Sequence, residues 1–207
     1  MNKNREQWIH DLVYSDLIQP EDIPDIGLYM DQVTTFMETR LSSQKRYPDD
    51  KIMTKTMINN YTKNKLLPPS DRKKYSREHV LMILMIYYLK NMLSISDIQT
   101  VLEPLGGRYF KQSSKKSLNV EEIYRHVLSD HEERKDAIFE ELTGILNDSC
   151  LNSAPENLSA ADQSYLEYFS LIYRLSHDIY IRKKLIERLI DDYRKDSPIG
   201  DNKKKKK

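Results

Sequence analysis

Apolar residues recur along most of this chain at intervals of three and four, the spacing that places them on one side of an α-helix. The pattern predicts a first amphipathic helix around residues 8–13, which the proline-containing stretch of residues 18–27 ends. A second predicted helix covers about residues 28–42. Alternating runs and turn dipeptides typical of strands are rare, and the chain has only five glycines. The pattern therefore predicts an all-α protein.

The middle of the chain is predicted to hold three helices and one irregular loop. Thr54 can cap a short helix, and the paired prolines of "KLLPPSDRKK" exclude helix from the loop after it. Ser76 then begins a helix that is apolar on all sides, as is typical of a helix at the centre of a domain. Ser94 and Asp97 form a capping box for one more short helix, which we expect Pro104 and the following glycines to close.

Two long helices are predicted in the C-terminal part. One runs from Asn119 to about residue 146, and the other begins at Ser159 and exceeds thirty residues. From Tyr165 to Tyr193, apolar residues recur at alternating intervals of three and four positions, and Arg182 is the one polar residue in this row. We interpret this helix as buried against a partner helix of the same chain. A second subunit could also pack on it, which would give a homodimer through the C-terminal helices.

Aromatic residues are frequent in this last helix, and their helical spacing is typical of a core. An effector pocket between the last helices is the alternative interpretation. The residues concerned are Tyr165, Tyr168, Phe169, Tyr173 and Tyr180.

Length and composition limit the class of protein. The 207 residues are 39% hydrophobic, enough for one large or two small domains. The longest apolar run, residues 80–89, is far shorter than the roughly 20 residues of a membrane span. The N-terminus lacks the apolar stretch of a secretory signal, so we expect a cytoplasmic protein without a membrane contact. Cys150 is the only cysteine and cannot form an internal disulfide.

Charge is sorted by segment, although the net charge is only +1. Residues 1–50 carry ten acids and five bases, and residues 119–196 carry seventeen acids and ten bases. Between Lys51 and Arg77 there are eight bases and one acid, Asp71. The tail of residues 203–207 is five lysines, which we predict to be disordered and to serve either solubility or non-specific attraction to nucleic acid. An anionic partner is therefore expected for the middle segment.

The order of elements in this segment resembles the DNA-binding region of the MerR family of transcriptional regulators. A bacterial family of domains of unknown function, itself suspected to be MerR-like, resembles the N-terminal half more closely. The matching elements are Tyr61, Leu66-Leu67-Pro68, Tyr75, the apolar helix of residues 80–93 and Ser94-Ile95-Ser96-Asp97-Ile98. The resemblance implies an all-α fold with a small wing, in which a winged helix-turn-helix region precedes a helical C-terminal region containing a long helix.

The same resemblance implies four segments. Residues 1–50 would form N-terminal helices packed on the DNA-binding unit, and residues 51–108 the winged helix-turn-helix. Residues 109–196 would form a helical region for dimerisation or effector binding, and residues 197–207 a disordered lysine-rich tail. The effector itself, the operator and the sign of regulation are left open.

Double-stranded DNA is the partner that this interpretation requires. In the major groove, Asn59 would bind adenine and Thr56 a base edge or a thymine methyl, while Lys55 and Lys63 would bind phosphates. The loop would act as a wing on the backbone through Arg72, Lys73 and Lys74, with Tyr75 at its base. The alternative for the same residues is a solvated basic face without a ligand.

No pattern of catalytic residues is recognisable, so we expect neither an enzyme nor a cofactor. Glu122, His126 and Asp130 lie four residues apart on one helix face, which is compatible with a metal, but no HExxH or cysteine pair supports one. The acids of residues 21–31 are better explained as helix caps than as calcium ligands. The alternative function is an all-helical protein–protein interaction module without DNA binding, which would use the acidic C-terminal half.

Overall fold

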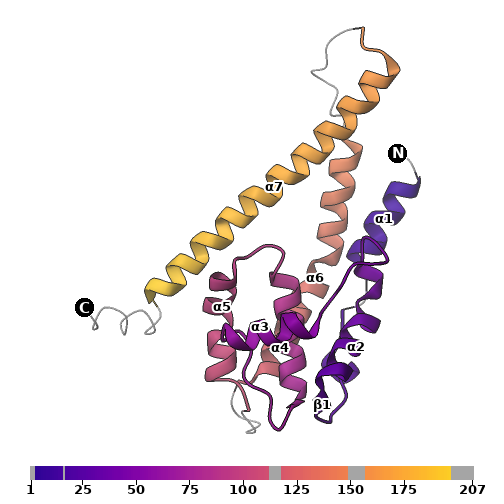
Figure 1. Ribbon diagram of the computed structural model, residues 1–207. Helices are drawn as coiled ribbons and strands as arrows, with labels where there is room; N and C mark the ends of the chain where they lie inside the picture. The colour runs from indigo at the N-terminus through magenta and orange to yellow at the C-terminus, as the bar shows by residue number, and fades with distance from the viewer. Residues whose placement is uncertain (1–2, 16, 112–117, 149–156, 197–207) are drawn as a thin grey trace. The chain divides into compact units, whose positions relative to one another are not determined.

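The computed structural model describes residues 3–15, 17–111, 118–148 and 157–196 (Figure 1). Cys150 and the tail of residues 197–207 lie outside these ranges. The chain forms two compact units: a core unit of Leu17–Leu128 with Asp192–Lys207, and a long-helix unit of Met1–Asp16 with Ser129–Asp191. The division falls within the long helix that begins near residue 120.

The described residues are mostly helical, as predicted, with one small two-stranded sheet. In chain order the elements are α1 (Lys3–Val13), the 3₁₀ helix η1 (Pro20–Asp22), β1 (Leu28–Tyr29), α2 (Met30–Arg40), the 3₁₀ helix η2 (Ser42–Gln44), α3 (Lys55–Lys63), β2 (Lys74–Tyr75), α4 (Arg77–Leu89), α5 (Ile95–Gly107), α6 (Val120–Asn147) and α7 (Ala160–Asp196).

The core unit is built around α4. Val80, Leu81, Met82, Ile83 and Leu84 are consecutive, and each has none of its surface exposed. A helix that buries five successive residues must be covered on every side. The covering side chains come from the apolar faces of the surrounding elements, and they include Val33, Met37, Ile58, Tyr61, Ile98, Leu102, Val120 and Tyr124. The prediction of a central helix from its all-round hydrophobicity is confirmed.

A two-stranded sheet joins the start of α2 to the start of α4. β1 and β2 are antiparallel, with Leu28 opposite Tyr75 and Tyr29 opposite Lys74. The sequence pattern placed Leu28 and Tyr29 in the second helix, because two residues are too few to show an alternating pattern. The loop after α3 is therefore tied through β2 to a segment about 45 residues earlier in the chain.

Two details of the predicted elements are wrong. Pro104 lies inside α5, which continues to Gly107, because proline removes one backbone donor but its φ is compatible with helix. Trp8 and Leu12 of α1 are exposed, while Ile9 and Val13 are the buried residues of that helix. Each of these errors concerns the orientation or the end of an element whose existence was predicted.

The long-helix unit contains α1, the C-terminal part of α6 and most of α7. Tyr14 donates a 2.6 Å hydrogen bond to Asp136, and its ring contacts Phe139 at 5.7 Å between ring centroids. Arg5 pairs with Glu167 at 3.3 Å. Only two residues of α7 are buried, Leu171 and Ile190. The prediction that the apolar stripe of α7 is core is therefore wrong for most of its length.

Twelve large apolar side chains of α7 are instead more than a third exposed. They are Tyr165, Tyr168, Phe169, Ile172, Tyr173, Ile179, Tyr180, Ile181, Leu185, Ile186, Leu189 and Tyr193. The rings of Tyr165, Phe169 and Tyr173 stack along the helix with centroids 5.9 and 6.2 Å apart. These aromatic side chains are therefore exposed and not part of a core.

Within the described ranges, no helix is both long enough and apolar enough to cross a membrane.

Lys65→Gly is predicted to stabilise the protein. Lys65 follows the end of α3 with a φ of 58°, the left-handed conformation in which a side chain is unfavourable and glycine is preferred. We expect the free energy of unfolding in urea to rise by about 0.5–1 kcal/mol. Lys65→Ala removes the same charge but keeps Cβ, so it should give no such increase. Equal effects of the two substitutions would show that charge, not conformation, is responsible.

Candidate nucleic-acid interface

α3 exposes one polar face and buries the other. Thr54 caps it by accepting a 3.2 Å hydrogen bond from the backbone of Met57, and Ile58 and Tyr61 anchor it to the core. The residues on the opposite side are all exposed: Lys55, Thr56, Asn59, Asn60 and Lys63. Nine residues of helix measure about 13 Å, comparable with the roughly 12 Å width of a B-DNA major groove.

The loop after α3 is fixed by two buried leucines. Leu66 and Leu67 are 1% and 2% exposed, and the backbone of Leu66 donates a 2.9 Å hydrogen bond to the carbonyl of Tyr61. The prolines that follow remain at or near the surface. The loop therefore leaves the end of α3 along a defined path toward the basic residues.

Those basic residues form a tight hairpin turn. Asp71 and Lys74 exchange two backbone hydrogen bonds of 3.0 and 2.8 Å, and the two residues between them, Arg72 and Lys73, have φ values of 48° and 66°. Two left-handed residues at the tip identify a type I′ turn, which is usually made by Asn-Gly. Here the strained tip carries two cations, and both are exposed.

Lys74 is placed by its neighbours in the sheet. Its Nζ lies 5.4 Å from the ring centroid of Tyr29 on β1, a cation–π distance. A Cβ on Gly27, just before β1, would lie 3.1 Å from the Lys74 Cβ, so any larger residue there would require Lys74 to shift. The third cation of the hairpin is thus held by β1.

His79 fastens the loop to α4. Its Nδ1 accepts a 3.0 Å hydrogen bond from the backbone of Ser76, and its Nε2 lies 3.3 Å from the carbonyl oxygen of Pro69. A carbonyl only accepts, so Nε2 carries the proton and the ring is neutral. His79 is 1% exposed, and its burial lowers the pKa of the imidazole below its ordinary value. Lys111 lowers this pKa by a smaller amount, and Pro69 and Asp71 act in the opposite direction.

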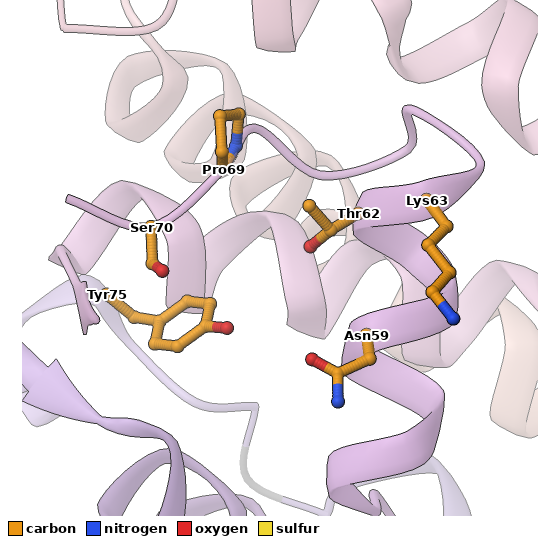
Figure 2. Close-up of a pocket in the computed structure, with 6 residues that line it drawn as sticks. All are labelled: Asn59, Thr62, Lys63, Pro69, Ser70 and Tyr75. Carbon is orange, nitrogen blue, oxygen red and sulfur yellow. The ribbon is translucent and has the colours of Figure 1, made fainter. Parts of the chain in front are cut away.

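A pocket of about 330 Å³ lies between α3 and the hairpin (Figure 2). Its lining residues are Asn59, Thr62 and Lys63 from α3 with Pro69, Ser70 and Tyr75 from the loop and hairpin. Residues of both elements line one cavity, so α3 and the hairpin lie side by side. Figure 2 shows the Tyr75 hydroxyl directed into the space toward Asn59 and Thr62.

Two bases of this segment are engaged by acids of the same unit. Lys55 forms an ion pair with Asp31 of α2. Arg77 lies 3.6 Å from a carboxylate oxygen of Asp25 and 3.7 Å from one of Glu121. Arg77 is also largely shielded from solvent, so it belongs to the structure of the unit and not to its basic surface.

Each predicted site residue of α3 and the hairpin can now be placed. Seven are exposed: Lys55, Thr56, Asn59, Lys63, Arg72, Lys73 and Lys74. Tyr75 is 5% exposed, and only its hydroxyl end borders the pocket. Sequence reasoning did not identify Thr62 and Ser70 as lining residues, because a threonine on an inward helix face and a serine in a turn have ordinary structural roles. No sequence pattern indicated the ion pair between Asp31 and Lys55 either.

Among the residues that the structure describes, no group of three histidine, cysteine, aspartate or glutamate side chains is arranged to hold a metal ion. Of the metal-compatible trio, Glu122 instead accepts a 3.2 Å hydrogen bond from the backbone of Asn119 at the start of α6. Asp130 lies 4.0 Å from Arg134.

Comparison with known proteins gives one match. Residues 18–127, more than half of the chain, match the model of a family described as a domain of unknown function, DUF1836. The matched range covers η1 to the first turns of α6 and thus contains α3, the hairpin and the pocket. No curated protein and no solved structure matches the chain.

The buried histidine predicts a loss of stability in mild acid. Because the folded pKa of His79 is below its unfolded value near 6.5, the unfolded chain takes up a proton that the folded chain resists. Stability from this group is therefore intact above about pH 6.5 and falls as the pH decreases toward the folded pKa, by at most about 1.4 kcal/mol per pH unit.

The measurement is urea unfolding of the wild type and His79→Gln between pH 7.5 and 5.5. Glutamine offers an acceptor and a donor but does not titrate. We expect the wild type to be the more stable protein at pH 7.5 and its advantage to shrink as the pH falls. An advantage that stays constant over this range would contradict the assignment of a neutral, buried imidazole.

Proposed function

The chain belongs to the DUF1836 family, and we propose that it binds double-stranded DNA as a transcriptional regulator of MerR-like type, without enzymatic activity. α3 enters the major groove, where Thr56 and Asn59 meet base edges. Lys55 and Lys63 bind phosphates on either side of it. The hairpin acts as a wing, with Arg72, Lys73 and Lys74 on the flanking backbone.

One observation carries this proposal: α3 and the basic hairpin line a common pocket, and their polar and basic side chains are exposed next to it. A regulator needs these residues on one accessible surface, because base readout and phosphate contacts must act together. A basic run distributed over separate surfaces would not support the same conclusion. The acidic stretch at residues 47–50 is itself exposed.

The conformation of the hairpin tip adds support. Arg72 and Lys73 occupy left-handed positions, at an expected conformational cost of about 1 kcal/mol each. Asparagine and glycine would remove much of this cost, but they would also remove two cations from the most protruding part of the hairpin. Local strain that is retained at an exposed basic tip is consistent with a role in binding.

A salt series tests DNA binding, with fluorescence anisotropy on the duplex upstream of the protein's own gene and on scrambled duplex. For this measurement, Lys203 to Lys207 are replaced by glutamine in the otherwise unchanged chain, so that the lysine tail adds no affinity for DNA. Six phosphate contacts predict a slope of log K against log salt of about −5. Tight, salt-dependent binding that prefers the native duplex is expected, and no binding to any duplex at low salt would contradict the proposal and favour a protein partner.

The double variant Arg72→Asn/Lys73→Gly should separate binding from folding. We expect its free energy of unfolding to rise by about 1 kcal/mol, because the turn gains its preferred residues. The same variant should bind DNA more weakly, with the slope reduced in magnitude by about 2. As a matched control, Arg134→Gln/Arg188→Gln removes two exposed cations from the long-helix unit and should leave the slope unchanged.

We also infer that a second copy of the chain covers the outer face of α7. Tyr165, Ile172, Ile179, Ile186 and Tyr193 recur at intervals of seven residues, and every one is at least 38% exposed. β-Branched residues at this heptad position, with leucine at the fourth, favour a parallel two-stranded coiled coil. Leu175 and Leu189 occupy that fourth position.

The area and charge of this face fit a second copy. A stable interface needs about 800 Å² per partner, and seven exposed apolar side chains lie in the seam itself: Tyr165, Tyr168, Ile172, Ile179, Ile186, Leu189 and Tyr193. In a parallel pair, Asp178 of one copy would face Lys183 of the other, and the two-fold axis makes this contact twice. A dimer presents two α3 helices, which suits a pseudo-palindromic DNA site.

Sedimentation analysis of the full-length protein tests the pairing. We expect a dimer of twice 24.6 kDa, which Ile179→Glu converts to a monomer because it places charge in the apolar seam. Val127→Glu is the matched control, since Val127 is exposed to a similar extent on α6.

In a Cys150→Ser background, Ile172→Cys should form a disulfide-linked dimer on oxidation, because parallel helices bring the same position of both copies together. A monomeric wild type would overturn the pairing, and a dimer without this cross-link would overturn its parallel orientation.

A further inference from the structure

The pocket between α3 and the hairpin has a chemical character that the DNA interface as a whole does not explain. Asn59, Lys63, Ser70 and Tyr75 each bring a group that can donate a hydrogen bond, and none of the six lining residues is acidic. The side chains of these four residues make no hydrogen bond or ion pair with another residue in the described ranges. Four donors around one cavity are thus available to a ligand.

Tyr75 is the most rigid of these donors. Its ring is buried, lies edge-on to His79 with 5.5 Å between the ring centroids, and its backbone is paired with Leu28. Its hydroxyl points into the cavity (Figure 2). A donor held in this way loses little conformational entropy when it binds, so its hydrogen bond retains most of its contribution to affinity.

We propose that this pocket binds one backbone phosphate of duplex DNA, which the hydroxyls of Ser70 and Tyr75 and the ammonium group of Lys63 hold together. The proposal rests on the proposed DNA-binding function and adds to it a defined phosphate site with two neutral donors. Two hydroxyl donors and a single cation line this cavity without a carboxylate, a set of groups that matches the oxygens of a phosphodiester.

The surroundings favour a polymer backbone over a free phosphate. One lysine offers little electrostatic attraction to a small dianion in water. The exposed Arg72, Lys73 and Lys74 lie on the hairpin that borders the pocket and would bind the next phosphates of a strand. Asn59 stands at the edge between the pocket and the outer face of α3, so a phosphate in the pocket would fix the register of the helix in the groove.

The test couples protein hydroxyls to individual DNA phosphates. The anisotropy duplex is prepared with a neutral methylphosphonate at each backbone position in turn, and binding is measured for the wild type, Ser70→Ala and Tyr75→Phe. Each variant should lose about 3- to 10-fold in affinity for unmodified DNA, as expected for one hydrogen bond. At one backbone position, the methylphosphonate should lower the affinity of the wild type by a similar or larger factor. The same modification should lower the affinity of each variant by less, because the variant has already lost its hydrogen bond to that phosphate.

Tyr47→Phe is the matched control, because it removes the hydroxyl of an exposed tyrosine outside the pocket and should bind like the wild type. Thermal unfolding of every variant shows whether it is folded. Inorganic phosphate is titrated into the wild type and both variants, with backbone amide chemical shifts as the readout.

The outcomes separate the two proposals. If the wild type binds duplex and neither variant differs from it at any position, the phosphate site is wrong and the DNA-binding function stands. If the wild type binds no duplex, both proposals fail. Binding of inorganic phosphate that depends on Ser70 and Tyr75, without duplex binding, would overturn the DNA backbone as occupant and identify a small phosphate ligand.

Discussion

The arrangement of the candidate interface depends on one buried, neutral imidazole. His79 lies in the first turn of α4, accepts from the backbone of Ser76 and reaches Pro69 in the loop. It also contacts Tyr75 and Phe110 edge-on, with 5.5 and 4.7 Å between ring centroids. One side chain thereby fixes the start of the central helix and the path of the loop. A polar residue at this depth is tolerated because both its nitrogens are satisfied.

On this surface, acidic side chains of the protein itself compete with any external anion for the basic residues. Asp31 already pairs with Lys55, and Asp71 stands at the base of the turn that carries Arg72 and Lys73. Exposed ion pairs of this kind contribute little to stability, about 0–1 kcal/mol. A phosphate would displace Asp31 from Lys55 at small cost, and the nearby acids would weaken non-specific attraction. In the proposed DNA complex, selectivity would then rest on shape and hydrogen bonds more than on charge alone.

Features with a regular local signal could be predicted from the sequence. The caps at Thr54 and Ser94 and the apolar run of α4 predicted elements that the structure contains. The four-residue spacing of Lys55, Asn59 and Lys63 predicted that they share one face of α3, and the structure shows all three exposed.

What escaped prediction depends on contacts distant in the chain or on very short elements. β1 has two residues, and its partner lies beyond α3. The pocket exists only because His79 and two buried leucines hold the loop beside α3. The orientation of α1 and the exposure of α7 were misjudged for a different reason: spacing shows which residues share a helix face, but not whether another element covers it.

The pairing of β1 with β2 also bears on the order of folding. Leu28 and Tyr75 are far apart in the chain, and closing such a loop costs entropy that the two-residue strands cannot offset alone. We expect the strands to pair once α2 and α4 have docked, so that the β1–β2 sheet forms late in folding. During synthesis, β1 can pair with β2 only after the ribosome has released residues 28–75.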